Sequence, residues 1–253
     1  MISAFGSLYL SFGANPRARL RLFCFPNAGG GASALHSWFR GLDPDVHLCP
    51  IQLPGRENRR RETPFTRILP LVRTLAEILE PLLDKPFVFF GHSLGALTAF
   101  ELARELRRRN LPGPERLLVS ARRSPDSRDP GPPVHNLPDR EFVIAVCRRY
   151  NAIPQAILAD KDMLQVFLPV LRADLEMIQA YIYVPEPPLA CPISAFGGLQ
   201  DPTTAEADLN GWRSHTACTF SLRMFRGDHF FPRAVPAAFT RAVAEELNGS
   251  LNR

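Results

Sequence analysis

Two patterns of apolar residues alternate along the chain, one typical of buried strands and one typical of helices. The strand-like runs are rich in aromatic and β-branched residues and lie at 19–26, 46–53, 87–90, 116–121, 193–198 and 218–225. Between them, apolar residues at helical spacing predict helices near 34–42, 69–83, 96–110, 139–150, 161–183, 203–215 and 234–247. Strands that alternate with helices predict an α/β fold, in which a mainly parallel sheet has helices on both faces.

The alternation is interrupted between residues 125 and 186. The stretch 125–138 is rich in Pro, Asp, Arg and Gly, which indicates irregular backbone, and two helical patterns then follow without a strand. In the second pattern, Pro169 should kink or interrupt the helix. An insertion between strands can form a lid over a site, although an apolar helical stripe is more often ordinary core.

We expect residues 1–253 to form a single α/β domain with a helical lid insertion at about 125–186. Four of its large side chains either line a pocket or pack against the sheet: Phe142, Met163, Phe167 and Met177.

Composition limits the class of protein. With 253 residues, 45% hydrophobic residues and 18 Phe, the chain can bury a sizeable core. No apolar run approaches the length of a membrane span, and the apolar residues 1–12 lack the basic start and the cleavage site of a signal peptide. The cysteines show no metal-ligand spacing and mostly fall in apolar runs; they are Cys24, Cys49, Cys147, Cys191 and Cys218. We therefore expect buried free thiols, no metal site and a cytoplasmic protein.

The net charge of +5 comes mainly from arginines, which cluster at 56–61, 107–109 and 122–123. Charge runs of this kind are most often solvated surfaces, and the arginines at 107–109 also complement the C-terminus of a predicted helix. No nucleic-acid-binding motif is visible. The positive balance is compatible with an acidic partner but does not require one.

The sequence PFVFFGHSLGA at residues 86–96 carries the strongest chemical signal. A buried strand runs into Gly91-His92-Ser93-Leu94-Gly95 and then into a helix, which gives the G-x-S-x-G pattern the context of a nucleophile elbow. Such a turn holds the serine in a strained conformation with its hydroxyl exposed, and the two glycines leave room for it. The alternative is an ordinary strand–helix turn that happens to contain Ser, because the pattern by itself is common.

A second glycine-rich loop, at residues 27–33, follows the first predicted strand. Gly29, Gly31 and Ala34 match the dinucleotide fingerprint G-x-G-x-x-A, but the acidic residue expected about twenty positions later is missing. The other interpretation is an oxyanion loop, whose backbone N–H groups face an incoming carbonyl oxygen. Because enzymes with a nucleophile elbow place a second oxyanion donor N-terminal to it, we expect the N–H groups of Ala28 and Leu94 to form an oxyanion hole.

A serine hydroxyl needs a base within hydrogen-bond reach and an acid that orients this base. In enzymes with a nucleophile elbow, these groups follow in the chain order Ser, acid, His, each after a strand. His229 follows the last predicted strand and Asp201 the strand before it, so they are the expected base and acid for Ser93. Asp126, after an earlier strand, is a rival acid, and Asp201 also suits a plain turn. His92 is expected to point away from the reaction.

Five segments, in this order, resemble the type II thioesterases that accompany polyketide synthases and nonribosomal peptide synthetases: FPNAGGGAS, LPGRENRR, FFGHSLGAL, GGLQDPT and RGDHFF. The resemblance covers nearly the whole chain. It implies an α/β-hydrolase fold with a helical lid and a Ser93–Asp201–His229 triad that works without metal or cofactor. It also implies hydrolysis of acyl or aminoacyl groups from the phosphopantetheine arm of acyl or peptidyl carrier proteins, which regenerates blocked synthases of antibiotic biosynthesis. Asp228 stands where the family often has a second glycine, which can alter the loop before His229.

Two other functions would use the same residues or the same fold. A serine esterase or lipase acting on small oxygen esters would have the same triad, so that only a comparison of substrates separates it. A non-catalytic module that binds carrier proteins is the second alternative, and the presence of Ser93, Asp201 and His229 speaks against it. None of the three functions involves nucleic acid or a membrane.

Overall fold

The computed structural model describes residues 17–39, 41–127, 131–150 and 153–251. In this part of the chain six strands form one sheet in the order β2-β1-β3-β4-β5-β6, and all neighbouring strands are parallel. The strands are β1 (Leu20–Phe25), β2 (Val46–Pro50), β3 (Phe87–His92), β4 (Arg116–Ser120), β5 (Ile193–Gly198) and β6 (Phe220–Phe225). The prediction of a mainly parallel sheet is confirmed.

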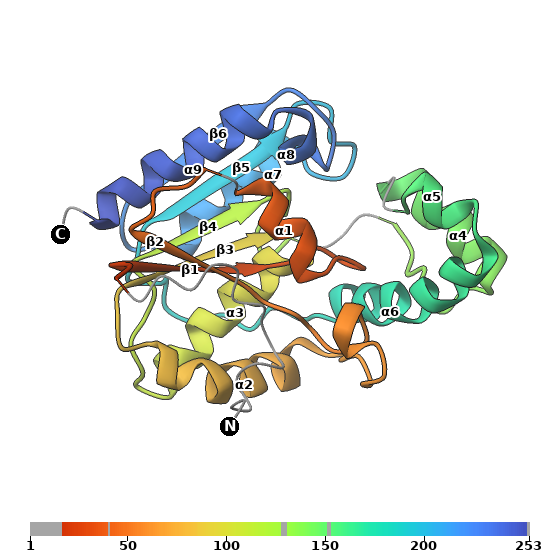
Figure 1. The fold of residues 1–253 in the computed structure, drawn as a ribbon, viewed down its shortest axis with the longest axis horizontal. Coiled ribbons are helices and arrows are strands. Elements are labelled where there is room, and N and C mark those ends of the chain that lie inside the picture. Colours follow the sequence, from red (N-terminus) through yellow and green to blue (C-terminus); the bar gives the residue numbers. More distant parts are fainter. Residues whose placement is uncertain (1–16, 40, 128–130, 151–152, 252–253) are drawn as a thin grey trace.

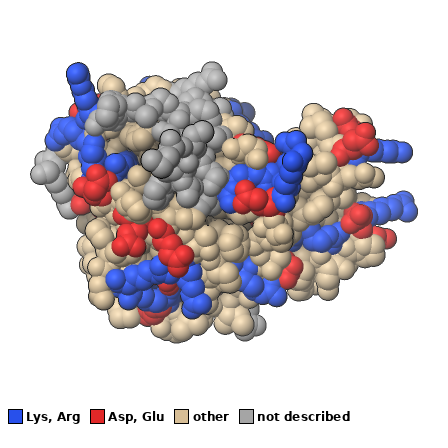
Figure 2. Space-filling model, turned by 60° about the horizontal axis from the view of Figure 1, so that its bottom comes forward, with Lys and Arg blue, Asp and Glu red and all other residues tan. Residues whose placement is uncertain are grey.

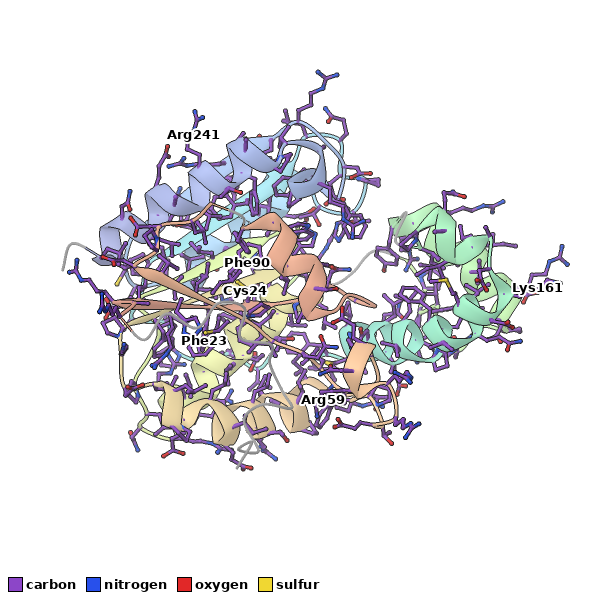
Figure 3. All side chains as sticks on the ribbon, viewed as in Figure 1. Phe23, Cys24, Arg59, Phe90, Lys161 and Arg241 are labelled. Carbon is purple, nitrogen blue, oxygen red and sulfur yellow. The ribbon has the colours of Figure 1, made fainter. Side chains whose placement is uncertain are left out.

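Helices cover both faces of the sheet (Figure 1). They are α1 (Ala32–Trp38), α2 (Ile68–Leu79), α3 (Leu94–Arg108), α4 (Asp139–Tyr150), α5 (Gln155–Leu158), α6 (Lys161–Gln179), α7 (Glu206–Asn210), α8 (Phe231–Ala234) and α9 (Pro236–Leu251), with 3-10 turns at Glu57–Arg59, Glu80–Leu82 and Gly211–His215. One core lies between α2, α3 and Phe23, and the other between α1, α9 and Phe90. Figure 3 shows Phe23 and Phe90 on opposite sides of the sheet. Successive strand residues point to opposite faces, so that each inner strand supplies both cores.

The helical insertion, α4 to α6, lies between β4 and β5 in the chain. In Figure 1 it stands beyond the carboxyl ends of the strands. Pro169 was predicted to kink or interrupt its long helix, and the interruption is wrong, because α6 continues through Pro169. Proline removes one helical N–H donor, but α6 buries Leu168, Leu171 and Leu175 around this position, and this packing compensates for the lost hydrogen bond. None of the helices in the described ranges is long and apolar enough to cross a membrane.

The arginines at 107–109 are paired with carboxylates of the same chain. Arg107 and Arg108 form ion pairs with Glu186, and Arg109 forms one with Glu105. Figure 2 shows one face of the molecule, on which many Lys and Arg side chains likewise lie next to Asp and Glu side chains. Much of the positive charge of this cluster is therefore neutralised within the fold, which leaves less of it for an acidic partner.

The cysteines follow the expectation of buried thiols only in part. Cys24, Cys49 and Cys191 are buried, Cys147 is partly buried and Cys218 is exposed. Burial raises the pKa of Cys49 and of Cys191 to about 12, so that these thiols stay protonated and unreactive at neutral pH. Cys218 contradicts the expectation because it precedes β6, which begins only at Phe220.

Candidate active site

Ser93 lies in the sharp turn between β3 and α3. Its backbone has φ 56° and ψ −115°, a left-handed conformation that costs energy for any residue with a side chain. The turn closes tightly, since a side chain at Gly91 would collide with the carbonyl of Gly95, and one at Gly95 with the carbonyl of Phe25. The Ser93 N–H donates to the carbonyl of Ser120 at the end of β4 (2.8 Å), which ties the turn to the sheet. The elbow geometry expected for G-x-S-x-G is therefore present.

His229 and Asp201 meet at the carboxyl ends of β6 and β5. Nδ1 of His229 lies 2.8 Å from Oδ2 of Asp201, so that the Nδ1–H group donates a hydrogen bond to the carboxylate and Nε2 of the neutral ring carries no hydrogen. Thr203 supports the carboxylate, because its N–H (2.8 Å) and its hydroxyl (2.7 Å) both donate to Oδ1 of Asp201. Burial favours a raised pKa for Asp201, but the hydrogen bond and the charge of His229 and the two bonds from Thr203 outweigh it and lower this pKa. The carboxylate is therefore ionised at neutral pH.

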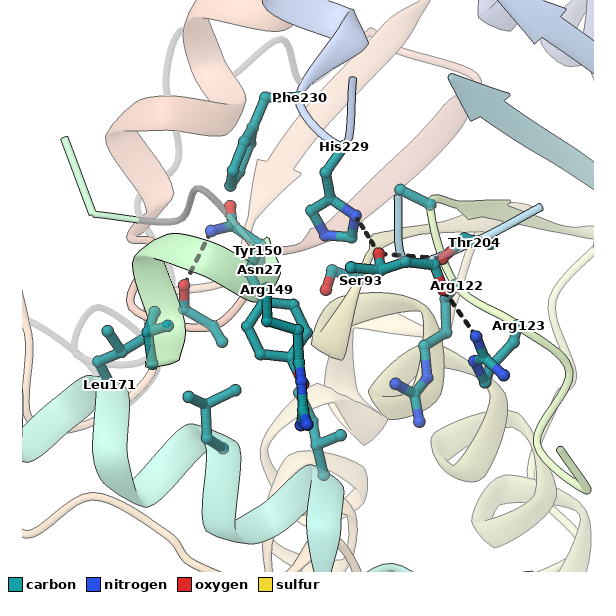
Figure 4. Close-up of a pocket in the computed structure, with 16 residues that line it drawn as sticks. Asn27, Ser93, Arg122, Arg123, Arg149, Tyr150, Leu171, Thr204, His229 and Phe230 are labelled. Atoms are coloured by element: carbon teal, nitrogen blue, oxygen red, sulfur yellow. Dashed lines mark hydrogen bonds between the residues drawn. The ribbon is translucent and has the colours of Figure 1, made fainter. Parts of the chain in front are cut away.

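Ser93 and His229 line the same narrow cavity, of about 40 Å³. Figure 4 shows the two side chains next to each other, with residues of the insertion facing them. The wall on the side of the insertion includes Val146, Arg149, Tyr150, Leu171, Leu175 and Ile178. The four side chains singled out from the sequence behave differently. Phe142 and Met177 are buried in the core, Met163 is half exposed, and the ring of partly buried Phe167 packs over Gly29.

The glycine-rich loop after β1 lies at this cavity, and Ala28 is part of the cavity lining. Two other N–H groups of the loop have partners, since Gly29 donates to Oδ2 of Asp174 (2.7 Å) and Gly30 to the carbonyl of Asn27 (2.9 Å). Leu94 is the first residue of α3, and the leading N–H groups of a helix have no acceptor within that helix. This arrangement favours the oxyanion interpretation of the loop over the dinucleotide interpretation.

His92 was expected to point away from the reaction, but its ring contacts the ring of His229. It is fully buried, and its ring packs against that of His229 with the ring centroids 5.3 Å apart. Nδ1 of His92 and the hydroxyl of Ser120 form a hydrogen bond of 2.9 Å. Burial, reinforced by the charges of His229 and Arg233, lowers the pKa of His92 well below its usual value. His92 is thus a neutral packing surface for the His229 ring, a contact that its position beside Ser93 in the sequence did not reveal.

The rival acid Asp126 lies elsewhere. Its Oδ1 is 3.0 Å from Nε2 of His215, and it lines a separate cavity of about 620 Å³ that includes neither Ser93 nor His229. Thr203 and Asp174 are two polar neighbours of the site that were not expected from the sequence. Thr203 lies within the segment GGLQDPT, two positions after an aspartate, which is a recognisable turn signal. Asp174 gave no such signal because it lies in the apolar pattern of a helix.

Within the ranges that the structure describes, no group of three or more His, Cys, Asp or Glu side chains is arranged to hold a metal ion. The chemical groups that meet at the cavity include a strained serine and a histidine with one nitrogen oriented by a carboxylate, and Ala28 of the glycine-rich loop lines the same cavity. This set suits nucleophilic attack on an acyl carbon.

Comparison with known proteins identifies the family. The model of the family described as thioesterase domain matches residues 20–251. The gramicidin S biosynthesis protein GrsT of Aneurinibacillus migulanus is 42% identical over 230 residues, which cover 91% of this chain and 90% of GrsT. The type II thioesterase BorB from the borrelidin biosynthetic cluster has a TM-score of 0.84 and 34% identity, over 95% of this chain and 96% of BorB. The RedJ thioesterase from the prodiginine biosynthetic pathway in Streptomyces coelicolor has a TM-score of 0.81 and 35% identity, over 94% of this chain and 99% of RedJ. The chain therefore belongs to the thioesterase domain family, and it is a thioester hydrolase with the α/β-hydrolase fold, of the type II group.

Proposed function

We propose that this enzyme releases acyl or aminoacyl groups from the phosphopantetheine arm of carrier proteins, and so regenerates polyketide or nonribosomal peptide synthases. The observation that carries the proposal is the hydrogen bond between His229 and Asp201 at a cavity shared with the strained Ser93. GrsT, BorB and RedJ are named for biosynthetic clusters or pathways, which supports the same setting for this chain. Because its proposed substrate is a carrier protein of a synthase, we expect the enzyme to act in the cytoplasm.

The first step transfers the acyl group to the enzyme. The Ser93 hydroxyl oxygen attacks the thioester carbon while Nε2 of His229 takes its proton, and the carbonyl oxygen becomes negatively charged. The N–H groups of Ala28 and Leu94 stabilise this charge. The tetrahedral intermediate collapses as the carbon–sulfur bond breaks, and His229 returns the proton to the leaving thiolate. Ser93 then carries the acyl group as an ester, and the arm carries a free thiol.

The second step restores the enzyme. A water molecule gives a proton to Nε2 of His229 and attacks the ester carbon, and the oxygen of Ser93 leaves with the proton that His229 returns. The product is a carboxylic acid. Asp201 stays ionised through both steps, fixes the tautomer of His229 and stabilises its charged form. Neither step involves a metal or an organic cofactor.

The helical insertion acts as the lid in this proposal, within one α/β-hydrolase domain. Its side chains form one wall of the cavity beside Ser93, which supports a role in admitting and holding the acyl group.

The test is acyl release from a loaded carrier protein, measured with the wild type and with Ser93→Ala, and with a small oxygen ester in parallel. We expect turnover of the carrier thioester that is lost in Ser93→Ala and exceeds turnover of the ester. Turnover confined to the ester would make the enzyme a general esterase. Hydrolysis that survives Ser93→Ala, or binding of the carrier protein without any hydrolysis, would exclude the proposed mechanism.

A further inference from the structure

The oxyanion loop is held from outside by three side chains of other segments. The Gly29 N–H donates to Oδ2 of Asp174 (2.7 Å), and the carbonyl of Gly30 accepts from Nη1 of Arg56 (3.1 Å). One turn further on, the Ala32 N–H donates to Oε1 of Gln52 (2.7 Å). These bonds fix the backbone on the C-terminal side of Ala28, whose N–H is the proposed oxyanion donor.

Asp174 and Arg56 form one planar, two-bonded ion pair beneath this loop. Nη1 of Arg56 lies 2.7 Å from Oδ2 of Asp174, and Nη2 lies 2.9 Å from Oδ1. The Asp174 side chain is completely buried and that of Arg56 is 6% exposed. A buried pair of this kind contributes little net stability, because desolvation of both charges offsets their attraction, whereas removal of one partner is costly. The pair therefore needs an explanation other than stability alone.

The position of Asp174 in the fold supplies that explanation. It lies on α6 of the insertion, between Leu171 and Leu175, which both line the cavity beside Ser93. The same stretch of α6 places the ring of Phe167 against Gly29, so that a Cβ added at Gly29 would lie only 2.6 Å from this ring. Gly29 adopts φ +70°, so that its backbone conformation and the closeness of this ring both favour glycine at this position.

We infer that Asp174, together with Arg56, is a positioning residue that holds the Ala28 N–H where the acyl oxygen becomes negative. The inference deepens the proposed function and rests on it. It also gives a role to Arg56, the first arginine of the segment LPGRENRR. Asp174 joins α6, which lines the cavity, to the oxyanion loop, so that the oxyanion hole is complete only when α6 is seated against the loop.

The decisive variant is the double substitution Arg56→Met with Asp174→Leu. Replacing both charges with apolar side chains of similar size leaves no unpaired charge and generally preserves stability. The Gly29 N–H and the Gly30 carbonyl nevertheless lose their partners. We expect kcat on the carrier thioester to fall by about 10- to 100-fold with little change in KM, because a displaced oxyanion donor affects the transition state more than the bound substrate. The single variant Asp174→Asn, which keeps an acceptor for the Gly29 N–H, should lose less if it folds.

A second readout separates positioning from general damage. An alkyl boronic acid adds the Ser93 oxygen to its boron and becomes a charged tetrahedral adduct that resembles the transition state. Its inhibition constant should rise in the double variant by about the same factor as kcat falls. The matched control is Glu101→Gln, because Glu101 and Arg104 form an ion pair on α3 that is equally buried, with both side chains 2% exposed. This control should change the free energy of unfolding but neither kcat nor boronate affinity.

The outcomes distinguish failure of the inference from failure of the proposed function. A folded double variant with wild-type kcat and boronate affinity would overturn the inference, as would equal losses in Glu101→Gln. In both cases the wild type would still be active and Ser93→Ala inactive. The proposed function fails instead if the wild type releases no acyl group or if Ser93→Ala remains active.

Discussion

The described part of this chain contains two His–Asp pairs that differ in three respects. In the pair at the cavity, Nδ1 of His229 meets an Asp201 carboxylate with no exposed side-chain surface. In the other pair, Nε2 of His215 meets Asp126, whose side chain is 48% exposed. Only the first pair shares a cavity with a strained serine. A His–Asp pair is therefore not in itself a sign of catalysis. The ring nitrogen that it leaves free, the burial of the carboxylate and a nucleophile within reach decide its role.

The largest contrast is expected from removing each histidine. His229→Ala should reduce kcat by about a million-fold, as loss of the catalytic histidine does in serine proteases. His215→Ala should leave kcat within a factor of about two and lower the free energy of unfolding by roughly 2 kcal/mol, because His215 packs between Trp212, Phe100 and Tyr183. Steady-state kinetics on a loaded carrier protein, with chemical denaturation in parallel, would check both values. A comparable loss of kcat in the two variants would remove the distinction between the pairs.

Substitution of the two aspartates should also affect kcat very differently. Asp201→Asn should lower kcat by about ten thousand-fold, because an amide no longer fixes the tautomer that keeps Nε2 of His229 available as the base. Asp126→Asn should leave kcat unchanged. Pre-steady-state acylation kinetics with the two variants would test this, and a strong loss in Asp126→Asn would revive the rival acid of the sequence analysis.

A smaller effect is expected from the hydroxyl groups that support each acid. Thr203→Val removes one of the two bonds from Thr203 to Asp201 and should cost about 1 kcal/mol of transition-state stabilisation, or roughly fivefold in kcat. Ser124→Ala is the matched change beside Asp126, where Ser124 helps to lower the pKa of the carboxyl. It should not alter kcat. Equal kcat values for Thr203→Val and the wild type would show that the backbone N–H of Thr203 is sufficient.

The smallest effect concerns stability in acid. Burial tends to raise the pKa of Asp126, but its bonds to Ser124 and His215 lower it below the usual 3.8. A carboxyl with a lowered pKa in the folded state stabilises the fold above about pH 4, and this contribution is lost as the pH falls through the folded-state pKa. Since Asp126 is half exposed, the contribution should stay within about 1 kcal/mol. Denaturation of Asp126→Asn between pH 5 and pH 2 should show a correspondingly shallower fall in stability than the wild type, and an unchanged fall would contradict this account.

Sequence reasoning succeeded where a feature is local. The run before Gly91 and the apolar face after Gly95 indicated the elbow, because a strand, a tight turn and a helix each follow from neighbouring residues. Ser93, Asp201 and His229 were chosen from chain order and from their places after strands, and the parallel sheet brings the loops of Asp201 and His229 together. Their catalytic roles remain predictions that the variants above test.

Features that depend on tertiary packing were not predictable. Arg56 and Asp174 are 118 positions apart, and nothing in either segment indicates that they pair. Pro169 was expected to kink or interrupt its helix, and α6 is not interrupted there, because local propensity does not include the packing of Leu168 and Leu171. The side chains that face Ser93 from the insertion depend on how α4 and α6 are seated, which no local pattern fixes.

The strand that leads to His229 is also the least buried strand of the sheet. Among the residues that the structure describes, β6 pairs only with β5 at the sheet edge, and each of its six residues is at least partly exposed, whereas those of β3 and β5 are all buried. Edge elements with few buried contacts open locally at a lower free energy than the centre of a domain. Amide hydrogens of β6 should therefore exchange faster than those of β3. On heating, activity should disappear before the sheet melts, because the enzyme loses its base once the edge opens.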